Sequence, residues 1–113
     1  MDVDPVYLTI ERAVPSGLIL NELVSNALKH AFPFGGEGIV TLTVRDLKDG
    51  TCMLSVADNG IGISTSTLDE SRSLGLRLVR SLAAQLGGRF ELVPQQRGTD
   101  ARLICEVHNE NSV

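Results

Sequence analysis

The sequence predicts an α+β fold, a two-layer α/β sandwich in which helices pack on one face of a mixed, largely antiparallel sheet. Helical and strand-like hydrophobic patterns follow one another along the 113 residues in the order helix, hairpin, loop, helix, hairpin. Each predicted strand has one apolar face and each long helix has one apolar stripe. Packing the helices on the sheet buries the apolar stripes of the helices and the apolar face of the sheet. One domain spanning residues 1–113 therefore accounts for the pattern.

The first predicted elements are a short strand and a long helix. Residues 6–10 alternate weakly between apolar and polar side chains and predict the strand. Helical spacing follows, and because a helix accepts proline in its first turn, Pro15 predicts a helix that starts at about Val14. The pair Phe32-Pro33 predicts where this helix ends.

Two hairpins, a loop and a second helix complete the predicted fold. Alternating apolar and polar side chains predict four strands, at residues 39–45, 51–57, 89–93 and 101–107. Residues 58–73 have no hydrophobic period and predict a loop, whose length is typical of functional loops. Residues 74–86 return to helical spacing, and Gly87-Gly88 predicts the end of that helix.

Composition excludes several classes of function. The net charge of −4 argues against nucleic acid as a partner, because a phosphate backbone requires a basic surface. No apolar run is long enough to predict a membrane span or direct membrane contact. The first residues lack the pattern of a signal peptide, so we expect a cytoplasmic location. Cys52 and Cys105 lie in apolar alternating segments and are expected to be buried thiols, with a disulfide as the alternative.

The most informative segment is residues 21–30, which read NELVSNALKH. At 100° per residue, one narrow arc of the predicted helix carries four polar residues, Glu22, Asn26, Lys29 and His30. An acid, an amide, an amine and an imidazole can together hold a cation, orient a nucleophile and neutralise phosphate. The alternative is an ordinary polar face that a helix turns to solvent.

Two glycine-containing segments could bring the backbone close to a ligand. Residues 58–62, DNGIG, follow a predicted strand directly and could place a carboxylate at the end of the sheet, although an Asp-Asn-Gly turn is the alternative. They lack the lysine and Ser/Thr of a Walker A loop. Residues 73–76, SLGL, are predicted to open the second helix, where free N–H groups attract anions, or to be simply the start of a helix.

Together these segments resemble the sequence boxes of sensor histidine kinases. Residues 21–30 resemble the N box of the branch that reads N-E-L-x-x-N-A-x-K-H-A-F, residues 58–62 the G1 box, and residues 73–79 the G2 box. Gly98-Thr99 resembles the G-T element of that group. The resemblance implies the Bergerat ATP-binding fold, shared with type II topoisomerases, mismatch-repair ATPases and a heat-shock chaperone, in a fragment of a larger sensor kinase.

The resemblance implies roles for the polar residues of the first helix. Asn26 would ligate Mg²⁺ through its side-chain carbonyl, with water and phosphates as the other ligands. Glu22, one turn away, would be the catalytic base or orienting acid for the incoming nucleophile. Lys29 and His30 would face the phosphates and the ribose.

The same resemblance assigns residues to adenine and to the triphosphate. Asp58 would accept a hydrogen bond from the adenine amino group, with Thr99 supporting it or reaching adenine through water. Gly60 and Gly62 would let the purine lie against the backbone. Main-chain N–H groups would be offered to the triphosphate by two further residues, Gly75 and Leu76, and residues 63–72 would form a lid over ATP.

The implied function is that of a kinase module without its own phosphoacceptor. The domain would bind Mg-ATP and transfer the γ-phosphoryl group to a histidine on a separate helical hairpin, from which a response regulator later takes it. Neither histidine of the chain, His30 or His108, resembles an acceptor site. The alternatives are an anti-sigma factor serine kinase of the same fold and a non-catalytic nucleotide-binding regulatory module.

Overall fold

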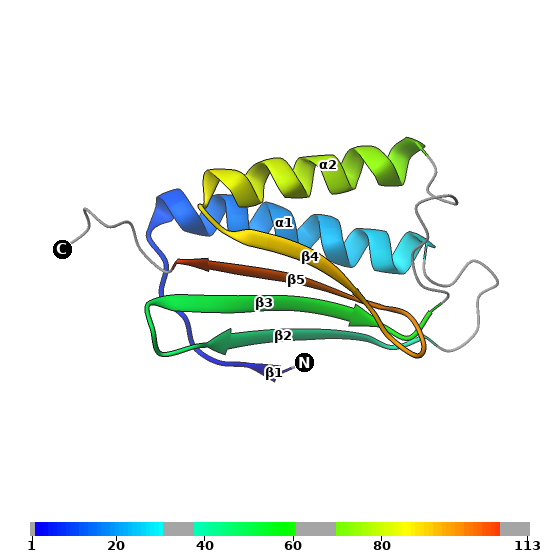
Figure 1. Ribbon diagram of the computed structural model, residues 1–113, viewed down its shortest axis with the longest axis horizontal. Coiled ribbons are helices and arrows are strands. Elements are labelled where there is room, and N and C mark those ends of the chain that lie inside the picture. The colour runs from blue at the N-terminus through cyan, green and yellow to red at the C-terminus, as the bar shows by residue number, and fades with distance from the viewer. Residues whose placement is uncertain (1, 31–37, 61–69, 107–113) are drawn as a thin grey trace.

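In the described residues, two helices pack on one face of a five-stranded sheet, as the sequence predicts (Figure 1). The computed structural model describes residues 2–30, 38–60 and 70–106, without the side chains of His30 and residues 70–73. Its elements are β1 (Asp2–Val3), α1 (Ile10–His30), β2 (Val40–Asp46), β3 (Thr51–Asp58), α2 (Glu70–Gln85), β4 (Arg89–Pro94) and β5 (Thr99–Glu106). The strand order is β1-β2-β3-β5-β4, and only β1 and β2 run parallel.

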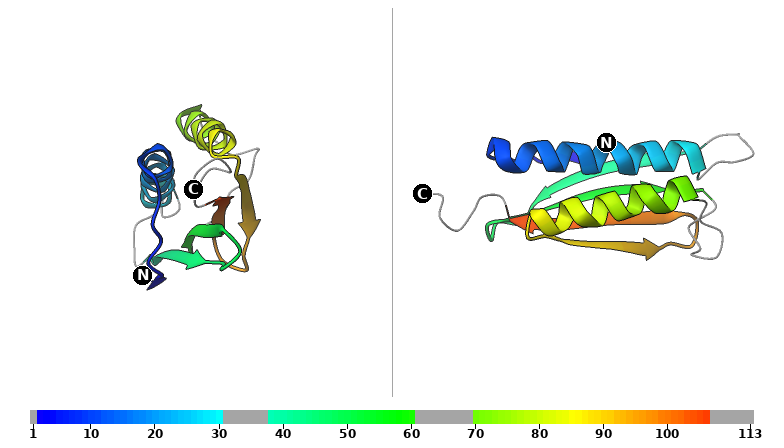
Figure 2. Two further views of the ribbon diagram at one scale, coloured as in Figure 1. Left: turned by 90° about the vertical axis from the view of Figure 1, so that its left-hand side faces the viewer. Right: turned by 90° about the horizontal axis from the view of Figure 1, so that it is seen from above.

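The core lies between the helical layer and the inner face of the sheet (Figure 2). In α1 the buried apolar residues recur every four positions, at Ile19, Leu23 and Ala27, which is the spacing of one helix face. In β3 they alternate, so that Cys52, Leu54 and Val56 all point toward the helices. The apolar face of the helix packs on the apolar face of the sheet and forms a single apolar layer. Both faces can be identified from the sequence, so the sequence was sufficient to predict this architecture.

The start of α1 differs from the prediction. The helix begins at Ile10 rather than at about Val14, and residues 6–10 form no strand. Thr9 is the N-cap, and its carbonyl accepts the N–H groups of Arg12 at 3.0 Å and Ala13 at 2.8 Å. Pro15 therefore lies in the second turn, where its missing N–H costs one hydrogen bond that the packing of the rest of α1 offsets.

The C-terminal end of α1 is described only as far as His30. The predicted end at Phe32-Pro33 falls outside the described residues.

The second helix also begins earlier than predicted. α2 starts at Glu70, within the segment predicted to be a loop, and not at residue 74. Its first turn is Glu-Ser-Arg-Ser, which has no apolar period for a sequence pattern to detect. The predicted end is confirmed: Gly87 adopts φ 63°, and the N–H groups of Gly87 and Gly88 bond to the carbonyls of Ala84 and Ala83. This is a Schellman motif, which closes a helix and requires a left-handed residue.

The predicted hairpins are confirmed, with β5 extended at its start. β5 begins at Thr99 rather than at residue 101, so the Gly-Thr pair lies at the beginning of this strand. Antiparallel pairing then sets Thr99 opposite Asp58, the last residue of β3. Both cysteines are buried free thiols, as expected. Within the described residues, neither helix has the length and apolar character needed to cross a membrane.

Candidate nucleotide site

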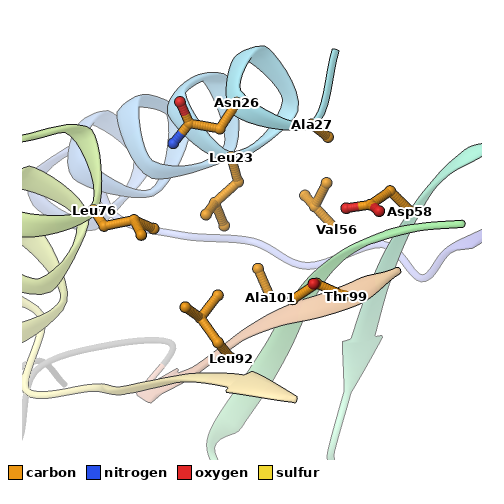
Figure 3. A pocket seen from close by; sticks show the side chains of 9 residues that line it. All are labelled: Leu23, Asn26, Ala27, Val56, Asp58, Leu76, Leu92, Thr99 and Ala101. Carbon is orange, nitrogen blue, oxygen red and sulfur yellow. The ribbon is translucent and has the colours of Figure 1, made fainter. Parts of the chain in front are cut away.

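A cleft opens where α1 and α2 meet the end of the sheet at which β3 finishes and β5 begins (Figure 3). Its empty volume is about 320 Å³, which includes space open to solvent. Nine side chains from five elements line it, namely Leu23, Asn26, Ala27, Val56, Asp58, Leu76, Leu92, Thr99 and Ala101. Asn26, Asp58, Leu76 and Thr99, predicted as site residues from segments far apart in the sequence, are thus brought together.

Asn26 is a buried amide with an unsatisfied donor. Its side chain projects from α1 at the rim of the cleft (Figure 3), and the residue is only 8% exposed. Among the described residues, its Nδ2 has no hydrogen-bond partner. A buried polar group without a partner costs about 1–3 kcal/mol, so such a group in a cleft needs an explanation. An acceptor atom of a ligand in the cleft would satisfy Nδ2, and the oxygen of the same amide could be presented to a cation.

Glu22 and Asn26 share a contact with α2 at Gly75. A Cβ atom placed on Gly75 would lie 3.2 Å from Cδ of Glu22 and 3.4 Å from Nδ2 of Asn26, and closer still to the Glu22 Oε1 oxygen. The absence of a side chain at this position lets the Glu22 carboxylate lie between the two helices. An acid and an amide one helical turn apart are therefore held near the same point of α2.

The other side of the cleft is organised by Asp58. Its Oδ1 oxygen accepts the N–H of Gly60 at 2.9 Å, and the described residues provide no donor to Oδ2. Gly98, in the turn before β5, packs on Asp58 with φ 88°, and a Cβ atom there would lie 2.7 Å from Oδ1. This turn and the Gly60 N–H together fix the carboxyl group, so Oδ2 is the oxygen to which no described residue donates.

Asn59 anchors the turn after β3, a role that sequence reasoning missed. Its Oδ1 accepts the N–H of Ile39 at 2.8 Å, and its own N–H bonds to the Ile39 carbonyl at 3.2 Å. The signal was available, because Asn in a turn often bonds to neighbouring backbone, but its partner lies 20 residues away in the sequence. These two bonds extend the pairing of β2 with β3 beyond Asp58.

An apolar floor below the polar groups was also missed. Val56 and Ala101 lie two positions from Asp58 and Thr99 on the inner face of the sheet, and Leu92 continues the floor on β4. Strand alternation predicts that they share a face, whereas the pairing of β5 between β3 and β4 decides that they lie together.

Among the predicted site residues in the described part of the chain, four do not line the cleft: Glu22, Lys29, Gly60 and Gly75. Lys29 is exposed to solvent. It follows Ala27, which is the last residue of α1 that lines the cleft. The side chain of His30 and the whole of Gly62 fall outside the described residues. Gly60 is present at the edge of the site through its bond to Asp58.

Gly75 and Leu76 lie further inside α2 than the sequence predicts, and their contact with the triphosphate stays a prediction. Because α2 begins at Glu70, both residues lie in its second turn, where an α-helix directs each N–H to the carbonyl four residues earlier. A helix leaves N–H groups without helical acceptors only in its first turn. In this conformation Leu76 contributes its side chain to the cleft, and Gly75 contributes space for Glu22.

Comparison with known proteins agrees with this geometry. A family described as histidine kinase-, DNA gyrase B-, and HSP90-like ATPase matches residues 13–109. Sensor histidine kinase PdtaS of Mycobacterium tuberculosis is 37% identical over 104 residues, which cover 88% of this chain and 21% of PdtaS. Blue-light-activated histidine kinase 2 of Erythrobacter litoralis is 31% identical over 114 residues, which cover 100% of this chain and 33% of that protein. The chain thus spans a fifth to a third of these relatives.

Solved structures show the same arrangement. The histidine kinase domain of the Erythrobacter litoralis EL346 blue-light activated histidine kinase matches with a TM-score of 0.83 at 30% identity, covering 94% of this chain and 49% of that one. The catalytic domain of histidine kinase ThkA shares the fold, with a TM-score of 0.75 at 21% identity over 96% of this chain and 78% of that one. The chain therefore belongs to the family of histidine kinase-, DNA gyrase B- and HSP90-like ATPases, and its predicted relation to sensor histidine kinases is confirmed.

Proposed function

We propose that this domain binds Mg-ATP in the cleft and donates the γ-phosphoryl group to a histidine on a separate helical hairpin of a larger cytoplasmic sensor kinase. A response regulator would then receive the phosphoryl group from that histidine. The observation that carries the proposal is the pair formed by the unsatisfied buried amide of Asn26 and the carboxylate of Asp58, on opposite sides of one apolar-floored cleft. Family membership supports ATP as the ligand.

The sheet side of the cleft suits adenine. The Asp58 Oδ2 oxygen can accept the exocyclic amino group, and Thr99 opposite it on β5 offers a hydroxyl for direct or water-mediated support. Gly60 lets the purine approach the backbone, as Gly62 would by resemblance. The apolar floor of Val56, Leu92 and Ala101 offers a surface for the flat ring.

The α1 side of the cleft suits the phosphates. Asn26 would bind Mg²⁺ through its amide oxygen, and the bound ion would neutralise charge on the phosphate oxygens. Glu22, one turn away, would orient the attacking imidazole and accept its proton. Lys29 and His30 would approach the phosphates and ribose from the end of α1. Phosphoryl transfer depends mainly on positioning and charge stabilisation, which this arrangement provides.

The acceptor residue distinguishes a histidine kinase from the anti-sigma serine kinase considered above. The two relatives named above are both histidine kinases, which favours histidine. Incubating the domain with Mg-ATP and a separately supplied acceptor hairpin should give acid-labile phosphohistidine. An acid-stable phosphoserine product would favour the alternative, and nucleotide binding without any transfer would favour the regulatory module.

Asn26→Ala tests the assignment of the site directly. Because the amide is assigned to the metal, the variant should lose about tenfold or more of the affinity that Mg²⁺ adds to ATP binding, equivalent to ~1.4 kcal/mol. Titration calorimetry with ATP in Mg²⁺ and in EDTA measures this increment. The matched control is Asn21→Ala, an exposed asparagine of the same helix that lies outside the cleft. If Asn26→Ala keeps the full Mg²⁺ increment, Asn26 is not the metal ligand.

A further inference from the structure

Two thiols face each other across β3 and β5, far from the nucleotide cleft. Cys52 and Cys105 are register partners, and their Sγ atoms lie 3.8 Å apart. Opposed residues of antiparallel strands have Cα atoms about 4.5 or 5.5 Å apart. Both spacings fall within the range of about 4.4–6.8 Å that a disulfide bridges. The strands therefore hold the two Cα atoms at a spacing that a disulfide can bridge, so forming the S–S bond requires mainly rotation of the side chains.

The surroundings make the two sulfurs chemically unequal. Arg12 of α1 donates through Nη1 to the carbonyls of Leu86 at 2.8 Å and Glu106 at 3.1 Å, which fixes its positive charge beside the end of β5. The hydrogen bond between the two thiols lowers the pKa of Cys105, and the charge of Arg12 acts in the lowering direction on both cysteines. The same hydrogen bond and burial raise the pKa of Cys52. Cys105 is therefore the cysteine that ionises to a thiolate, and Cys52 is the one that stays protonated.

Cys105 is buried near the end of β5, where it packs against a glycine turn. Cys52 is fully buried and Cys105 is 3% exposed, at the second-last position of β5. The turn that packs on Cys105 is Gly87-Gly88, and a Cβ atom on Gly88 would lie only 2.9 Å from Cβ of Cys105. The glycine turn therefore packs directly against Cβ of Cys105, with no side chain between them.

We propose that Cys52 and Cys105 form an oxidative modification site, at which a peroxide converts the two thiols into a disulfide within the domain. The Cys105 thiolate attacks one peroxide oxygen, the O–O bond breaks, and the products are a Cys105 sulfenic acid and hydroxide, which takes up a proton as water. Cys52 then attacks the sulfenic sulfur, the S–O bond breaks, and a second water leaves with the proton of Cys52. The two sulfurs are each oxidised by one electron, and the peroxide is reduced to two waters.

The expected consequence is a more stable domain with an unchanged nucleotide site. The bond would join residues 53 apart in sequence, which restricts the unfolded chain. Asp58 lies six residues along β3 from Cys52, about 20 Å away. We therefore expect oxidation to raise the melting temperature while nucleotide affinity changes by less than about twofold, as for sites well beyond direct contact.

The test treats the intact chain with hydrogen peroxide, then denatures it and blocks remaining thiols with N-ethylmaleimide before mass spectrometry. We expect the chain to lose two hydrogens, to resist alkylation and to yield a Cys52–Cys105 linked peptide. Dithiothreitol should reverse both the link and the rise in melting temperature. The chain has only two cysteines, so each single variant is the control for the other. Cys52→Ser should stop at a sulfenic acid that dimedone traps, and Cys105→Ser should react far more slowly.

A urea series keeps the test decisive if a serine variant does not fold. For the unsubstituted chain, the linking rate should be nearly constant at urea concentrations below the unfolding transition, because the folded state positions the pair. A rate that follows the unfolded fraction would overturn the proposal. So would peroxide treatment of the folded chain that gives only linked dimers or sulfinic acid. These readouts require no nucleotide, so their failure leaves the proposed function untouched.

Discussion

At the scale of single residues, two glycines inside helices show how local space decides their role. Gly17 and Gly75 are both interior to a helix, where glycine is less favourable than alanine. A Cβ atom on Gly17 would meet nothing within 4 Å, whereas one on Gly75 would displace the end of the Glu22 side chain. Only Gly75 is therefore tied to the cleft.

Gly75→Ala should impair phosphoryl transfer more than folding. The added methyl group pushes the flexible Glu22 carboxylate away from its place between the helices. The rate of phosphoryl transfer to a supplied hairpin should therefore fall by about tenfold or more, approaching the roughly 10²–10⁴-fold loss of rate expected when a general base is removed. The free energy of unfolding should change by no more than about 1 kcal/mol, since helix propensity improves. Transfer assays and urea denaturation measure the two effects.

The matched control for that substitution is Gly17→Ala. It should raise the free energy of unfolding by about 0.5–1 kcal/mol and leave transfer unchanged. Equal transfer rates in the Gly75→Ala variant and the unsubstituted domain would show that the contact between Gly75 and Glu22 has no catalytic importance.

At the scale of elements, the two hairpin turns contain glycines with the same left-handed backbone conformation, but only one of these turns contacts the site. Gly50 and Gly98 have nearly the same dihedral, φ 86° and 88°, in the left-handed region that favours glycine. Gly50 faces open space, whereas Gly98 packs against the backbone and carboxyl group of Asp58. The first turn only reverses the chain, and the second also supports a site residue.

Gly98→Ala should therefore cost more stability than Gly50→Ala, and only Gly98→Ala should weaken ATP binding. Strain alone costs about 1–2 kcal/mol at either turn. At Gly98 the new Cβ also forces Asp58 to move, because the nearest atoms are backbone. Urea denaturation and ATP titration of both variants provide the measurement. Equal losses of stability with unchanged ATP affinity would contradict the supporting role of this turn.

The β2–β3 turn also contains acids whose ionised forms stabilise it. Lys48 donates its backbone N–H to Asp46 at 2.9 Å and Thr51 donates its own to Asp49 at 3.0 Å. Hydrogen bonds from Lys48 lower the pKa of Asp46, and hydrogen bonds from Thr51, its hydroxyl first, lower the pKa of Asp49. A folded-state pKa below the ordinary 3.8 means that this stabilisation is present above that pH and is lost as the pH falls through the lowered value.

Asp49→Asn isolates this pH dependence, because asparagine keeps an acceptor and removes the charge. The variant should be less stable than the unsubstituted domain at neutral pH, and the difference should shrink as the pH falls below 3.8. Free energies of unfolding measured between neutral pH and acid provide the comparison. A difference that stays constant over that range would mean that the charge of Asp49 contributes nothing to folding.

At the scale of the whole molecule, Arg12 joins three elements at the end opposite the cleft. It is buried on α1, and its Nη1 donates to the carbonyl after α2 and to the last carbonyl of β5. One charged donor shared by these two carbonyls ties α1 to the end of α2 and to the end of β5.

Arg12→Met should keep much of the apolar stem but lose about 1.5–3 kcal/mol of stability, the scale of a hydrogen bond to a charged group. Chemical denaturation measures the loss. The control is Arg77→Met, an exposed residue of α2, which should shift stability by about 0.5 kcal/mol or less. Similar values for the two variants would show that Arg12 does not tie the elements together.

The sequence by itself determined the fold class, the hairpins and the order of the motifs. Each of these depends on patterns within a few residues: alternation for strands, a stripe for helices, and glycines for the end of α2. The segment containing Glu22 and Asn26 was identified in the same way, because its polar residues recur at helical spacing. Resemblance then predicted the family, which the comparisons confirm.

Only the tertiary structure decided which of these residues share a cleft and what each one contacts. The starts of α1 and α2 depend on capping and packing beyond the hydrophobic period, which is why Gly75 moved from a helix start to a helix interior. The cleft itself depends on β5 pairing with β3, which sets Thr99 opposite Asp58 and brings Leu92 beneath them. Such pairing joins segments distant in sequence, and a local pattern contains no information about its register.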